Sequence, residues 1–412
     1  MCSISKIAGL ALSATLALSV PVWAGNLVIN ADTSDPAPKA AWQSVIADFQ
    51  KANPDIKVSF NVYDHESYKT SIRNWLTSAA PDVVFWYVGT RMKQFSTPGL
   101  LADVSSIFTP TVKSELGPVA TDLVTDGGKQ YGMPYTYYNW GIYYRKDIFA
   151  KAGVTSPPKT WAEFLDACAK IKKSGVSPIA LGEKDLWPIA GWFDYLDVRT
   201  NGYKFHMDLL HGKTSWTDPK VKKVFAEWKQ VVTPGYFVPH SESLSWQEAQ
   251  SALFQGKAAM MVIGNFITPN FPKNIAGDMA FMPFPVINPK VKDTEDAPMD
   301  SIHIPAKAKN KADALKFLAY VATAPVQQKI NIALNQVPVN HKASVKDDVF
   351  LKEGQALLNH AAHLTQFFDR DSPEDFANIG MRGFEQFMIH PDQEDQVLAS
   401  LDSARKRIYK VK

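Results

Sequence analysis

The first part of the chain alternates between short apolar strands and amphipathic helices, and this alternation limits the folds that it can adopt. Residues 27–31 form an apolar run typical of a buried strand, and apolar residues then recur at i, i+3, i+4 and i+7 from Trp42, as on one face of a helix. A second strand over 56–62, a helix over 66–77 and a third strand over 81–86 follow. Repeated strand–helix–strand units predict an α/β fold with a mainly parallel, doubly wound sheet.

A second region of the same kind is predicted further along the chain. Thr160 with Glu163, and Ser245 with Glu248, have the spacing of a capping box, in which side chains satisfy the free backbone N–H groups of a helix start. Gly256 is placed to end the helix that follows Ser245. Because a chain of 412 residues exceeds one compact core of usual size, we expect at least two such units.

Two segments are candidates for chain crossings between the units. Residues 131–135 carry turn-forming Gly and Pro and lie between the two regions. The Pro-rich residues 283–298 are the candidate return crossing. No internal repeat and no low-complexity tract is found in the sequence, which excludes solenoid and fibrous folds.

The N-terminus indicates export from the cytoplasm. Lys6 precedes an apolar run over residues 7–22, which ends in a small-x-small pattern at residues 22–24. The alternative is a retained membrane anchor, but 16 residues rich in Ala and Ser are short for a span. We therefore interpret residues 1–24 as a secretory signal peptide.

Removal of residues 1–24 would leave Cys168 as a single cysteine, which cannot form an intramolecular disulfide. A thiol nucleophile is one interpretation of Cys168. The other is a small buried hydrophobe, and we favour it because Phe164, Leu165 and Ile171 share its predicted helix face. A secreted protein of this size without disulfides fits the bacterial periplasm.

Charge and motifs exclude several function classes. The 44 basic and 41 acidic residues give a net charge of +3, so nothing indicates a nucleic-acid partner. The sequence lacks G-x-S-x-G, C-x-x-C and H-E-x-x-H, and Met207 stands where a phosphate loop ending at residues 212–214 needs its first glycine. His360 and His363 could share a helix face and bind a metal, but we expect a solvated surface there. We therefore expect no catalytic residues, no cofactor and no metal.

A series of short motifs runs through most of the chain after residue 24. They are residues 80–84 (APDVV), 126–135 (DGGKQYGMPY), 143–154 (YYRKDIFAKAGV), 157–164 (PPKTWAEF), 254–260 (FQGKAAM), and 311–320 (KADALKFLAY) followed by 336–338 (QVP). In this order they resemble the bacterial extracellular solute-binding proteins of family 1, the periplasmic sugar receptors of ABC importers. Each motif alone is weak evidence for the family. The occurrence of all of them in this order is what makes the resemblance specific.

The resemblance implies a two-lobed periplasmic binding protein fold, with hinge crossings and a cleft between the lobes. Its expected lobes are residues 25–136 plus about 283–332, and residues 137–282 plus about 333–412. The resemblance also implies that hinge closure traps a ligand without chemical reaction, and that the loaded form docks transiently on a membrane ABC permease. We expect a monomer.

Candidate ligand-binding residues follow the predicted strands of the first lobe, because ligands of α/β folds bind at the carboxyl ends of strands. Asp32 and Ser34 come after the first strand, Asp64 after the second, and Trp86 and Tyr87 at the end of the third. Sugars need flat apolar faces for their C–H groups and polar side chains for their hydroxyls. Asp64 could instead cap a helix, and Trp86 could belong to the core.

Two further acidic residues have structural interpretations. Asp35 stands directly before Pro36, so we expect a helix cap rather than a ligand contact. Asp82 is expected to fix a turn.

The densest aromatic cluster covers residues 135–140. Alternation along an extended chain puts Tyr137 and Asn139 on one face and Tyr138 and Trp140 on the other. The resemblance implies that this segment lines the cleft, and we favour the face of Tyr137 and Asn139.

Three tryptophans of the second lobe are further candidates. Trp187 and Trp192 lie in a stretch expected to be loop-rich, where an exposed Trp suggests contact with a ligand. Core packing is the alternative for both. Trp246 opens a predicted helix.

The resemblance adds the last candidates, Asn265, Asp300, Gln336 and Arg370. The first three stand at cleft positions of the family, where the polar residues could instead satisfy turns. Phe266 replaces the Trp often found near there. Arg370 lies between Asp369 and Asp371, with which we expect local ion pairs; the alternative is an anion-binding guanidinium in the cleft.

Together these features predict a periplasmic receptor that binds a neutral mono- or oligosaccharide. A periplasmic glycoside hydrolase is the alternative from another class, since it also combines aromatics with carboxylates. An acidic or sulfonated sugar held by Arg370 is a second alternative. A receptor that serves chemotaxis would use the same closed form.

Overall fold

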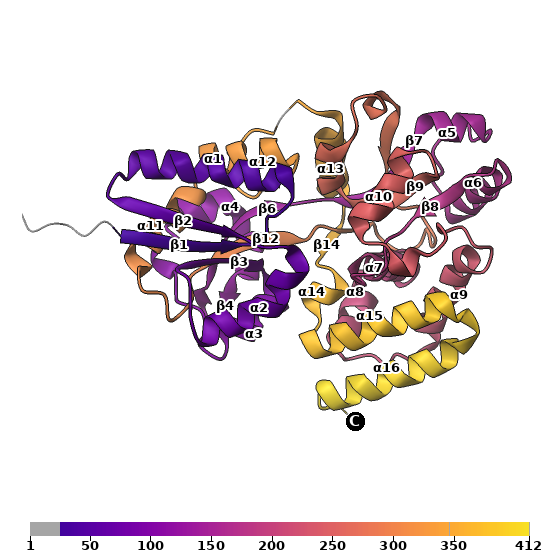
Figure 1. Cartoon of the computed structure of the whole chain (residues 1–412). Helices are drawn as coiled ribbons and strands as arrows, with labels where there is room; N and C mark the ends of the chain where they lie inside the picture. The colour runs from indigo at the N-terminus through magenta and orange to yellow at the C-terminus, as the bar shows by residue number, and fades with distance from the viewer. Residues whose placement is uncertain (1–24, 346, 412) are drawn as a thin grey trace, which may run out of the picture.

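A computed structural model describes residues 25–345 and 347–411. The predicted signal peptide, residues 1–24, lies outside the described residues. Figure 1 shows two lobes side by side, each with a sheet covered by helices. Across the residues that the structure describes, no helix combines the length and the apolar character needed to cross a membrane.

The first lobe is built on a six-stranded sheet with the order β13-β6-β12-β3-β1-β2. The strands β1, β2 and β3 are parallel, as the sequence predicts, but β12 runs antiparallel to both β3 and β6. The sheet is therefore mixed rather than mainly parallel, because β12 enters it from the other lobe and not through a crossover helix. The strands are β1 (Gly25–Ala31), β2 (Ile56–Val62), β3 (Val83–Tyr87), β6 (Gly132–Tyr137), β12 (Met299–His303) and β13 (Val337–Pro338).

Helices cover this sheet and bury the apolar faces predicted for them. Trp42 is fully buried on the first helix, with its ring centroid 4.7 Å from Phe85 on β3 and 4.9 Å from Tyr135 on β6. Burial of one such side chain stabilises the fold by about 1.5–3 kcal/mol. The helices are α1 (Pro36–Ala52), α2 (His65–Thr77), α3 (Gly89–Ser96), α4 (Pro110–Leu123), α11 (Lys311–Val321) and α12 (Ala324–Leu334), with a small hairpin of β4 (Thr125–Asp126) and β5 (Lys129–Gln130).

Asp82 has the structural role expected of it. Its carboxylate is buried and accepts the backbone N–H groups of Val28, Lys309 and Asn310 at 2.9, 3.0 and 2.8 Å. It thereby ties β1 to the segment before α11, rather than fixing one local turn.

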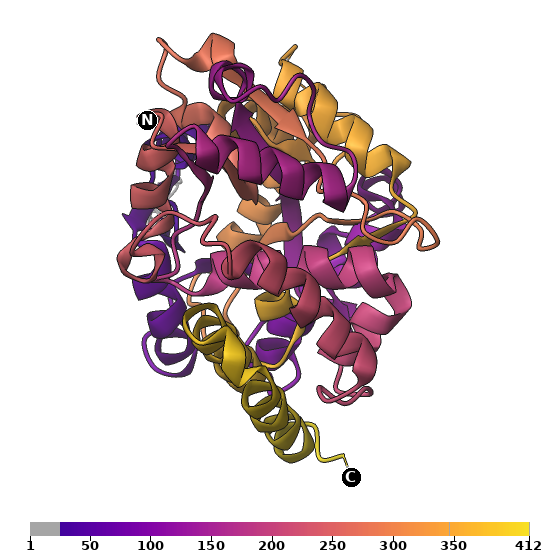
Figure 2. The same ribbon diagram turned by 90° about the vertical axis from the view of Figure 1, so that its right-hand side faces the viewer.

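The second lobe holds a four-stranded sheet with the order β10-β7-β9-β8. Its strands are β7 (Trp140–Arg145), β8 (Ser177–Ala180), β9 (Ala258–Gly264) and β10 (Met279–Met282). Its helices are α5 (Lys146–Lys151), α6 (Trp161–Lys173), α7 (Trp187–Asn201), α8 (Tyr203–Leu210), α9 (Pro219–Val232), α10 (Trp246–Phe254), α13 (Val349–His360), α14 (Phe368–Asp371), α15 (Glu374–Ile389) and α16 (Glu394–Ile408). Figure 2 shows α15 and α16 packed side by side as a hairpin at the C-terminus.

Local signals in the sequence are confirmed in this lobe. Thr160 and Ser245 both form capping boxes, with Glu163 and Glu248, and Gly256 follows α10 with a φ of 72°. Cys168 is fully buried on α6, and burial raises the pKa of its thiol.

The chain leaves the first sheet later than the sequence suggested. Residues 132–135 belong to β6, and the chain passes to β7 through Tyr138 and Asn139. Pro134 is tolerated within β6 because it lies beside a register shift between Asp300 and Ser301 on β12.

The chain returns to the first lobe through the Pro-rich segment and crosses to the second lobe once more after β13. These two crossings decide which residues belong to each lobe. The Pro-rich return spans the interval between β10 and β12, in which β11 (Thr294–Asp296) pairs with β14 (His363–Thr365). We propose the lobe division expected from the sequence with one change: the last boundary lies after residue 339 instead of near residue 332. The reason is that β13 pairs with β6 and Val339 belongs to the core of the first lobe.

Candidate functional site

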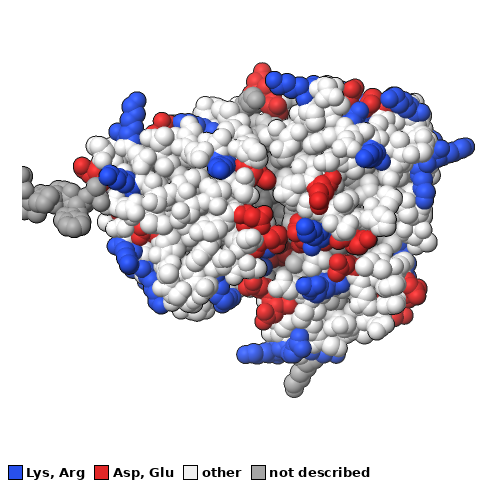
Figure 3. Space-filling model, viewed as in Figure 1, with Lys and Arg blue, Asp and Glu red and all other residues white. Residues whose placement is uncertain are grey.

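A cavity of about 170 Å³ lies between the two lobes. Figure 3 shows a hollow at this place with acidic side chains gathered around it. Nine of the residues predicted from the sequence line the cavity: Asp32, Ser34, Asp64, Tyr87, Trp187, Trp246, Asp300, Gln336 and Arg370. The remaining five, Trp86, Tyr137, Asn139, Trp192 and Asn265, lie outside its lining.

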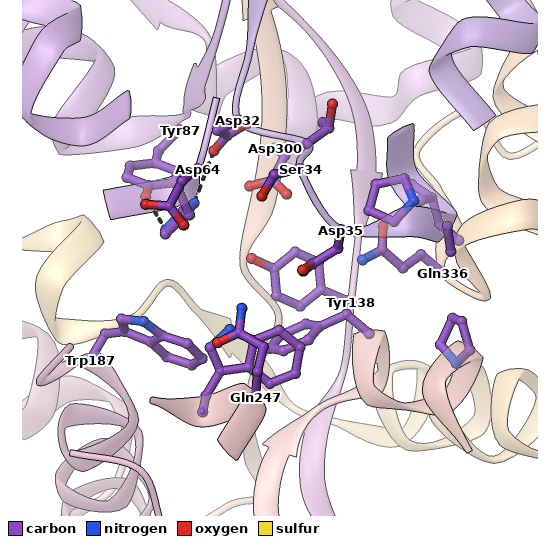
Figure 4. Close-up of a pocket in the computed structure, with 18 of the residues that line it drawn as sticks. Asp32, Ser34, Asp35, Asp64, Tyr87, Tyr138, Trp187, Gln247, Asp300 and Gln336 are labelled. Atoms are coloured by element: carbon purple, nitrogen blue, oxygen red, sulfur yellow. Dashed lines mark hydrogen bonds and ion pairs between the residues drawn. The ribbon is translucent and has the colours of Figure 1, made fainter. Parts of the chain in front are cut away.

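One side of the cavity is a carboxylate wall, formed by Asp32, Asp35, Asp64 and Asp300 (Figure 4). The first three follow β1 and β2 at the carboxyl ends of these parallel strands, and Asp300 lies on β12. Parallel strands bring the residues after them to one edge of the sheet, which is why side chains far apart in sequence meet here.

Asp64 caps a helix and also lines the cavity. Its Oδ1 accepts the backbone N–H groups of Glu66 and Ser67, each at 3.1 Å, and so caps α2. Burial acts in the opposite direction, but these hydrogen bonds hold the pKa of Asp64 below its usual range. The carboxylate therefore stays ionised at the cavity.

Asp35 occupies the N-cap position of α1, but its side chain makes no capping hydrogen bond. It lines the cavity instead, opposite Gln247 of the second lobe (Figure 4). Burial raises the pKa of Asp35, and the nearby side-chain amide of Gln247 opposes this effect. The expected side-chain cap is thus absent, and Asp35 belongs with the cavity residues.

A chain of hydrogen bonds connects three side chains of the first lobe. His65 Nδ1 lies 3.1 Å from Asp32 Oδ2, and His65 Nε2 lies 3.2 Å from the hydroxyl of Tyr87. His65 was not predicted as a site residue, although it directly follows Asp64 after a strand end. The chain fixes the orientation of Asp32 and Tyr87 before any ligand binds.

Arg370 comes from the short helix α14 and crosses to the first lobe. Its guanidinium donates to Asp300 Oδ1 at 2.9 Å and lies 4.0 Å from the ring centroid of Tyr87. The expected local pairs with Asp369 or Asp371 are absent from its contacts. Asp369 itself lines the cavity, and its backbone carbonyl accepts a hydrogen bond from Arg91, whereas the carboxylate of Asp371 accepts one from Thr90.

The opposite side of the cavity is an aromatic wall of the second lobe. It consists of Tyr138, Trp140, Trp187, Trp246 and Phe266. The Trp246 and Phe266 ring centroids are 5.2 Å apart, and the Tyr138 and Phe266 centroids 5.5 Å apart, both in edge-to-face geometry. Phe266 therefore occupies the centre of the wall at the position where the sequence departs from the family pattern.

The aromatic segment presents the other face from the one favoured. Tyr138 and Trp140 line the cavity, whereas Tyr137 packs against the first core and Asn139 is fully buried against Gly354. The chain passes between the two sheets at this segment, so the simple alternation of one strand does not decide which side faces a ligand.

The other three predicted residues, Trp86, Trp192 and Asn265, contact protein groups outside the cavity. Trp86 is buried on β3, and its indole N–H donates to the carbonyl of Arg91 at 3.2 Å. Trp192 is fully buried on α7, and Asn265 donates to the carbonyl of Asn335 at 2.9 Å. The alternative interpretation as core residues fits the contacts of both tryptophans, whereas Asn265 joins two segments 70 residues apart rather than satisfying a local turn.

Residues 25–345 and 347–411 contain no group of three or more His, Cys, Asp and Glu side chains placed to hold a metal ion. His360 ends α13 whereas His363 lies on β14, stacked on Tyr203 with centroids 4.4 Å apart. The two histidines therefore do not share a helix face.

Comparisons with known proteins agree with this architecture. A family described as bacterial extracellular solute-binding protein matches residues 33–328. An uncharacterised ABC transporter extracellular-binding protein of Pyrococcus horikoshii is 26% identical over 88% of this chain and 84% of its own. A multiple sugar-binding protein of Streptococcus mutans is 24% identical over 70% of each chain.

Solved structures show the same two-lobed fold. The bacterial solute receptor AcbH, described as having an exclusive preference for β-D-galactopyranose, is 30% identical and superposes with a TM-score of 0.87. The superposition covers 94% of this chain and 100% of the receptor. A chitin oligosaccharide binding protein, 21% identical, superposes with a TM-score of 0.83 over 93% of this chain and 99% of its own.

Proposed function

Because this chain belongs to the bacterial extracellular solute-binding proteins, we propose that it is the periplasmic receptor of an ABC importer and captures a neutral sugar between its lobes. The observation that carries the proposal is the cavity with an aromatic wall on one side and a carboxylate wall on the other. A sugar presents both kinds of surface at once, because its C–H groups form flat apolar faces and its hydroxyls point outward.

The charges around the cavity favour an uncharged ligand. Arg370 is its one buried cation among the residues described, and Asp300 already neutralises it at 2.9 Å. An anionic sugar would have to displace Asp300 and then face the ionised Asp64 and its neighbour Asp32. Like charges in a partly desolvated cavity repel, so we expect acidic and sulfonated sugars to bind weakly.

The volume of the cavity favours one sugar ring. A space of about 170 Å³ holds roughly a dozen water-sized atoms, which is the size of a single hexose. We infer that the ligand is a monosaccharide or that one unit of an oligosaccharide occupies the cavity. D-galactose is the first probe, since the receptor AcbH is described as preferring it, and chitin oligosaccharides are the second.

Binding is tested by calorimetry after a thermal-shift screen of these sugars. Trp246→Ala removes part of the aromatic wall and is expected to weaken binding about fivefold, since an aromatic platform contributes on the order of 1 kcal/mol. Trp75→Ala is the matched control, because Trp75 lies on α2 outside the cavity. Equal losses in both variants, or no sugar bound by the wild type, would contradict the proposal.

A glycoside hydrolase is tested in the same samples. Its two catalytic carboxyls stand on opposite sides of the scissile bond, roughly 5 Å or 6.5–9.5 Å apart. Asp32, Asp64 and Asp300 lie on one wall in the first lobe, but Asp369 of the second lobe also lines the cavity, so the positions of the carboxyls do not distinguish the two functions. The match to the solute-binding family favours the receptor. We therefore expect labelled oligosaccharides to be recovered intact after incubation, and any cleavage product would refute the receptor assignment.

Delivery to a permease requires a change of shape on binding. We propose that the lobes close about the crossings at residues 138–139 and 283–298 and at the segment after β13. Small-angle scattering should report a smaller radius of gyration with saturating sugar. An unchanged radius at saturation, with tight binding shown by calorimetry, would contradict closure.

A further inference from the structure

A ring of buried hydrogen bonds joins the two lobes behind the cavity. It connects Asn335, which follows α12 in the first lobe, with the short helix η3 (Asn265–Asn270), which follows β9 in the second lobe. Asn265 Nδ2 donates to the carbonyl of Asn335 at 2.9 Å, and Asn335 Nδ2 donates to the hydroxyl of Thr268 at 2.8 Å. That hydroxyl in turn donates to the carbonyl of Asn265 at 2.8 Å, which closes this interlobe ring.

The interlobe ring lies outside the ligand space, but the chain continues from both of its sides into the cavity. Asn265, Thr268 and Asn335 are buried and do not belong to the cavity lining. The next residues in the chain, Phe266 and Gln336, line the cavity from the second and the first lobe (Figure 4 labels Gln336). The ring therefore connects a cavity residue of one lobe to a cavity residue of the other.

Other contacts hold these two cavity residues within their own lobes. The backbone N–H of Gln336 donates to the carbonyl of Asn331, on α12 of the first lobe, at 3.0 Å. Phe266 is packed edge-to-face against Tyr138 and Trp246 in the aromatic wall. These contacts do not fix Phe266 relative to Gln336. The interlobe ring supplies that connection.

The backbone and the surroundings of Asn335 suit a residue that joins segments. It ends α12 in the left-handed region, with a φ of 53°, which Asn adopts more readily than most residues. Its side-chain amide also donates to Asp348 Oδ1 at 3.1 Å, and this carboxylate caps α13. The ring lies beside the first crossing, since the backbone N–H of Asn265 donates to the carbonyl of Asn139 at 3.0 Å. Contacts beside a hinge can persist while the lobes rotate.

We propose that Asn335 is a positioning residue for the cavity: through the interlobe ring it keeps Phe266 and Gln336 at a fixed spacing, so that both contact one sugar ring. The proposal rests on the proposed function, because this spacing matters only where the cavity binds a sugar. Opening the ring lets the lobes adopt a wider range of relative orientations. A smaller fraction of the protein then presents both residues to the ligand, and the apparent affinity falls by that fraction.

Two substitutions open the ring from opposite lobes and leave the cavity lining intact. Thr268→Val keeps the shape of the side chain and removes the hydroxyl, whereas Asn335→Gly keeps the left-handed backbone and removes the amide. Thr268→Ser retains the hydroxyl and should leave the ring closed. Thr200→Val is the matched control, because Thr200 is buried in the same lobe on α7 and its hydroxyl has no hydrogen-bond partner among the described residues.

The first measurement is the distance between the lobes with no sugar present. Spin labels on Ala47→Cys in α1 and Ala226→Cys in α9 report this distance by double electron–electron resonance. Both alanines are exposed, and their helices lie on different lobes (Figure 1). Thr268→Val and Asn335→Gly should widen the spread of distances, whereas Thr268→Ser and Thr200→Val should keep the spread of the wild type. Asn335→Gly decides the matter should Thr268→Val not fold.

The second measurement is calorimetric titration with D-galactose. Thr268→Val and Asn335→Gly should each weaken binding about fivefold, the effect of one buried hydrogen bond. The double variant should bind about as weakly as either single variant, because both substitutions remove the hydrogen bond between these side chains. A role in folding alone would lower the urea midpoint and leave the spread of distances and the affinity unchanged.

Three results would overturn the proposal. The first is an unchanged spread of distances in the folded Thr268→Val and Asn335→Gly variants. The second is an equal widening in Thr268→Ser, which would show that the hydroxyl is not the cause. The third is a wider spread with unchanged affinity for galactose. Absence of galactose binding by the wild type would speak against the proposed function instead, and the distances alone would then decide the role of the ring.

Discussion

The pair of Arg370 and Asp300 allows a quantitative test of how the two lobes meet at the cavity. The Arg370 side chain is 9% exposed and that of Asp300 is 26% exposed. Arg370→Met keeps most of the side-chain volume but leaves Asp300 without its cation. Breaking a buried pair in this way costs about 3–5 kcal/mol, and the partial exposure of Asp300 reduces that to about 2–3 kcal/mol. Loss of the cation–π contact with Tyr87 adds about 0.5–1 kcal/mol.

We therefore expect Arg370→Met to lower the free energy of unfolding by about 3 kcal/mol, measured by urea denaturation with circular dichroism. With a slope of about 3 kcal/mol per molar urea, the midpoint falls by about 1 M. Asp300→Asn added to this variant should restore at least about 1 kcal/mol, because it removes the unpaired charge. A single variant within 0.5 kcal/mol of the wild type, at about the error of such comparisons, or a double variant no more stable than the single one, would refute the reasoning.

Three further predictions follow from buried groups. Iodoacetamide should label Cys168 only after unfolding, as peptide mass mapping can show, because burial raises the pKa of the thiol and hides it; rapid labelling of the native protein would contradict this. Burial lowers the pKa of His303 to about 4, so the unfolded chain binds a proton in the range where the folded protein does not. Stability is then full above about pH 6.5 and falls as the pH decreases toward 4, by about 2 kcal/mol at pH 5, and His303→Gln should remove this loss in urea titrations at two pH values. Asp82→Ala should destabilise the protein by more than about 3 kcal/mol in the same assay, because it strands the backbone N–H groups of Val28, Lys309 and Asn310; a loss below about 1 kcal/mol would show that water replaces the carboxylate.

Features set by neighbours in the sequence could be predicted. The capping boxes at Thr160 and Ser245 depend on residues three positions apart, and the buried face of α1 depends on helical spacing. The strand-end positions of Asp32 and Asp64 likewise follow from local strand and helix patterns, since the edge of a parallel sheet then brings them together.

Features set by contacts between distant segments could not be predicted. The partner of Arg370 lies 70 residues earlier, on a strand of the other lobe, and the acidic neighbours in sequence misled the prediction. The face that residues 137–140 turn to the cavity depends on where the chain leaves β6. The alternation of residue types along the segment does not reveal that position. Trp192 shows the same limit, because its place in the core is decided by helices packed around α7.

The crystal structure of the protein with the sugar that binds most tightly in the screen tests the central claim most directly. We expect one sugar ring in the cavity, with an apolar face on Trp187, Trp246 or Phe266 and hydroxyls within hydrogen-bond distance of Asp32 or Asp64. Arg370 should remain paired with Asp300. A sugar bound outside this cavity, or one whose charged group has displaced Asp300 from Arg370, would contradict it.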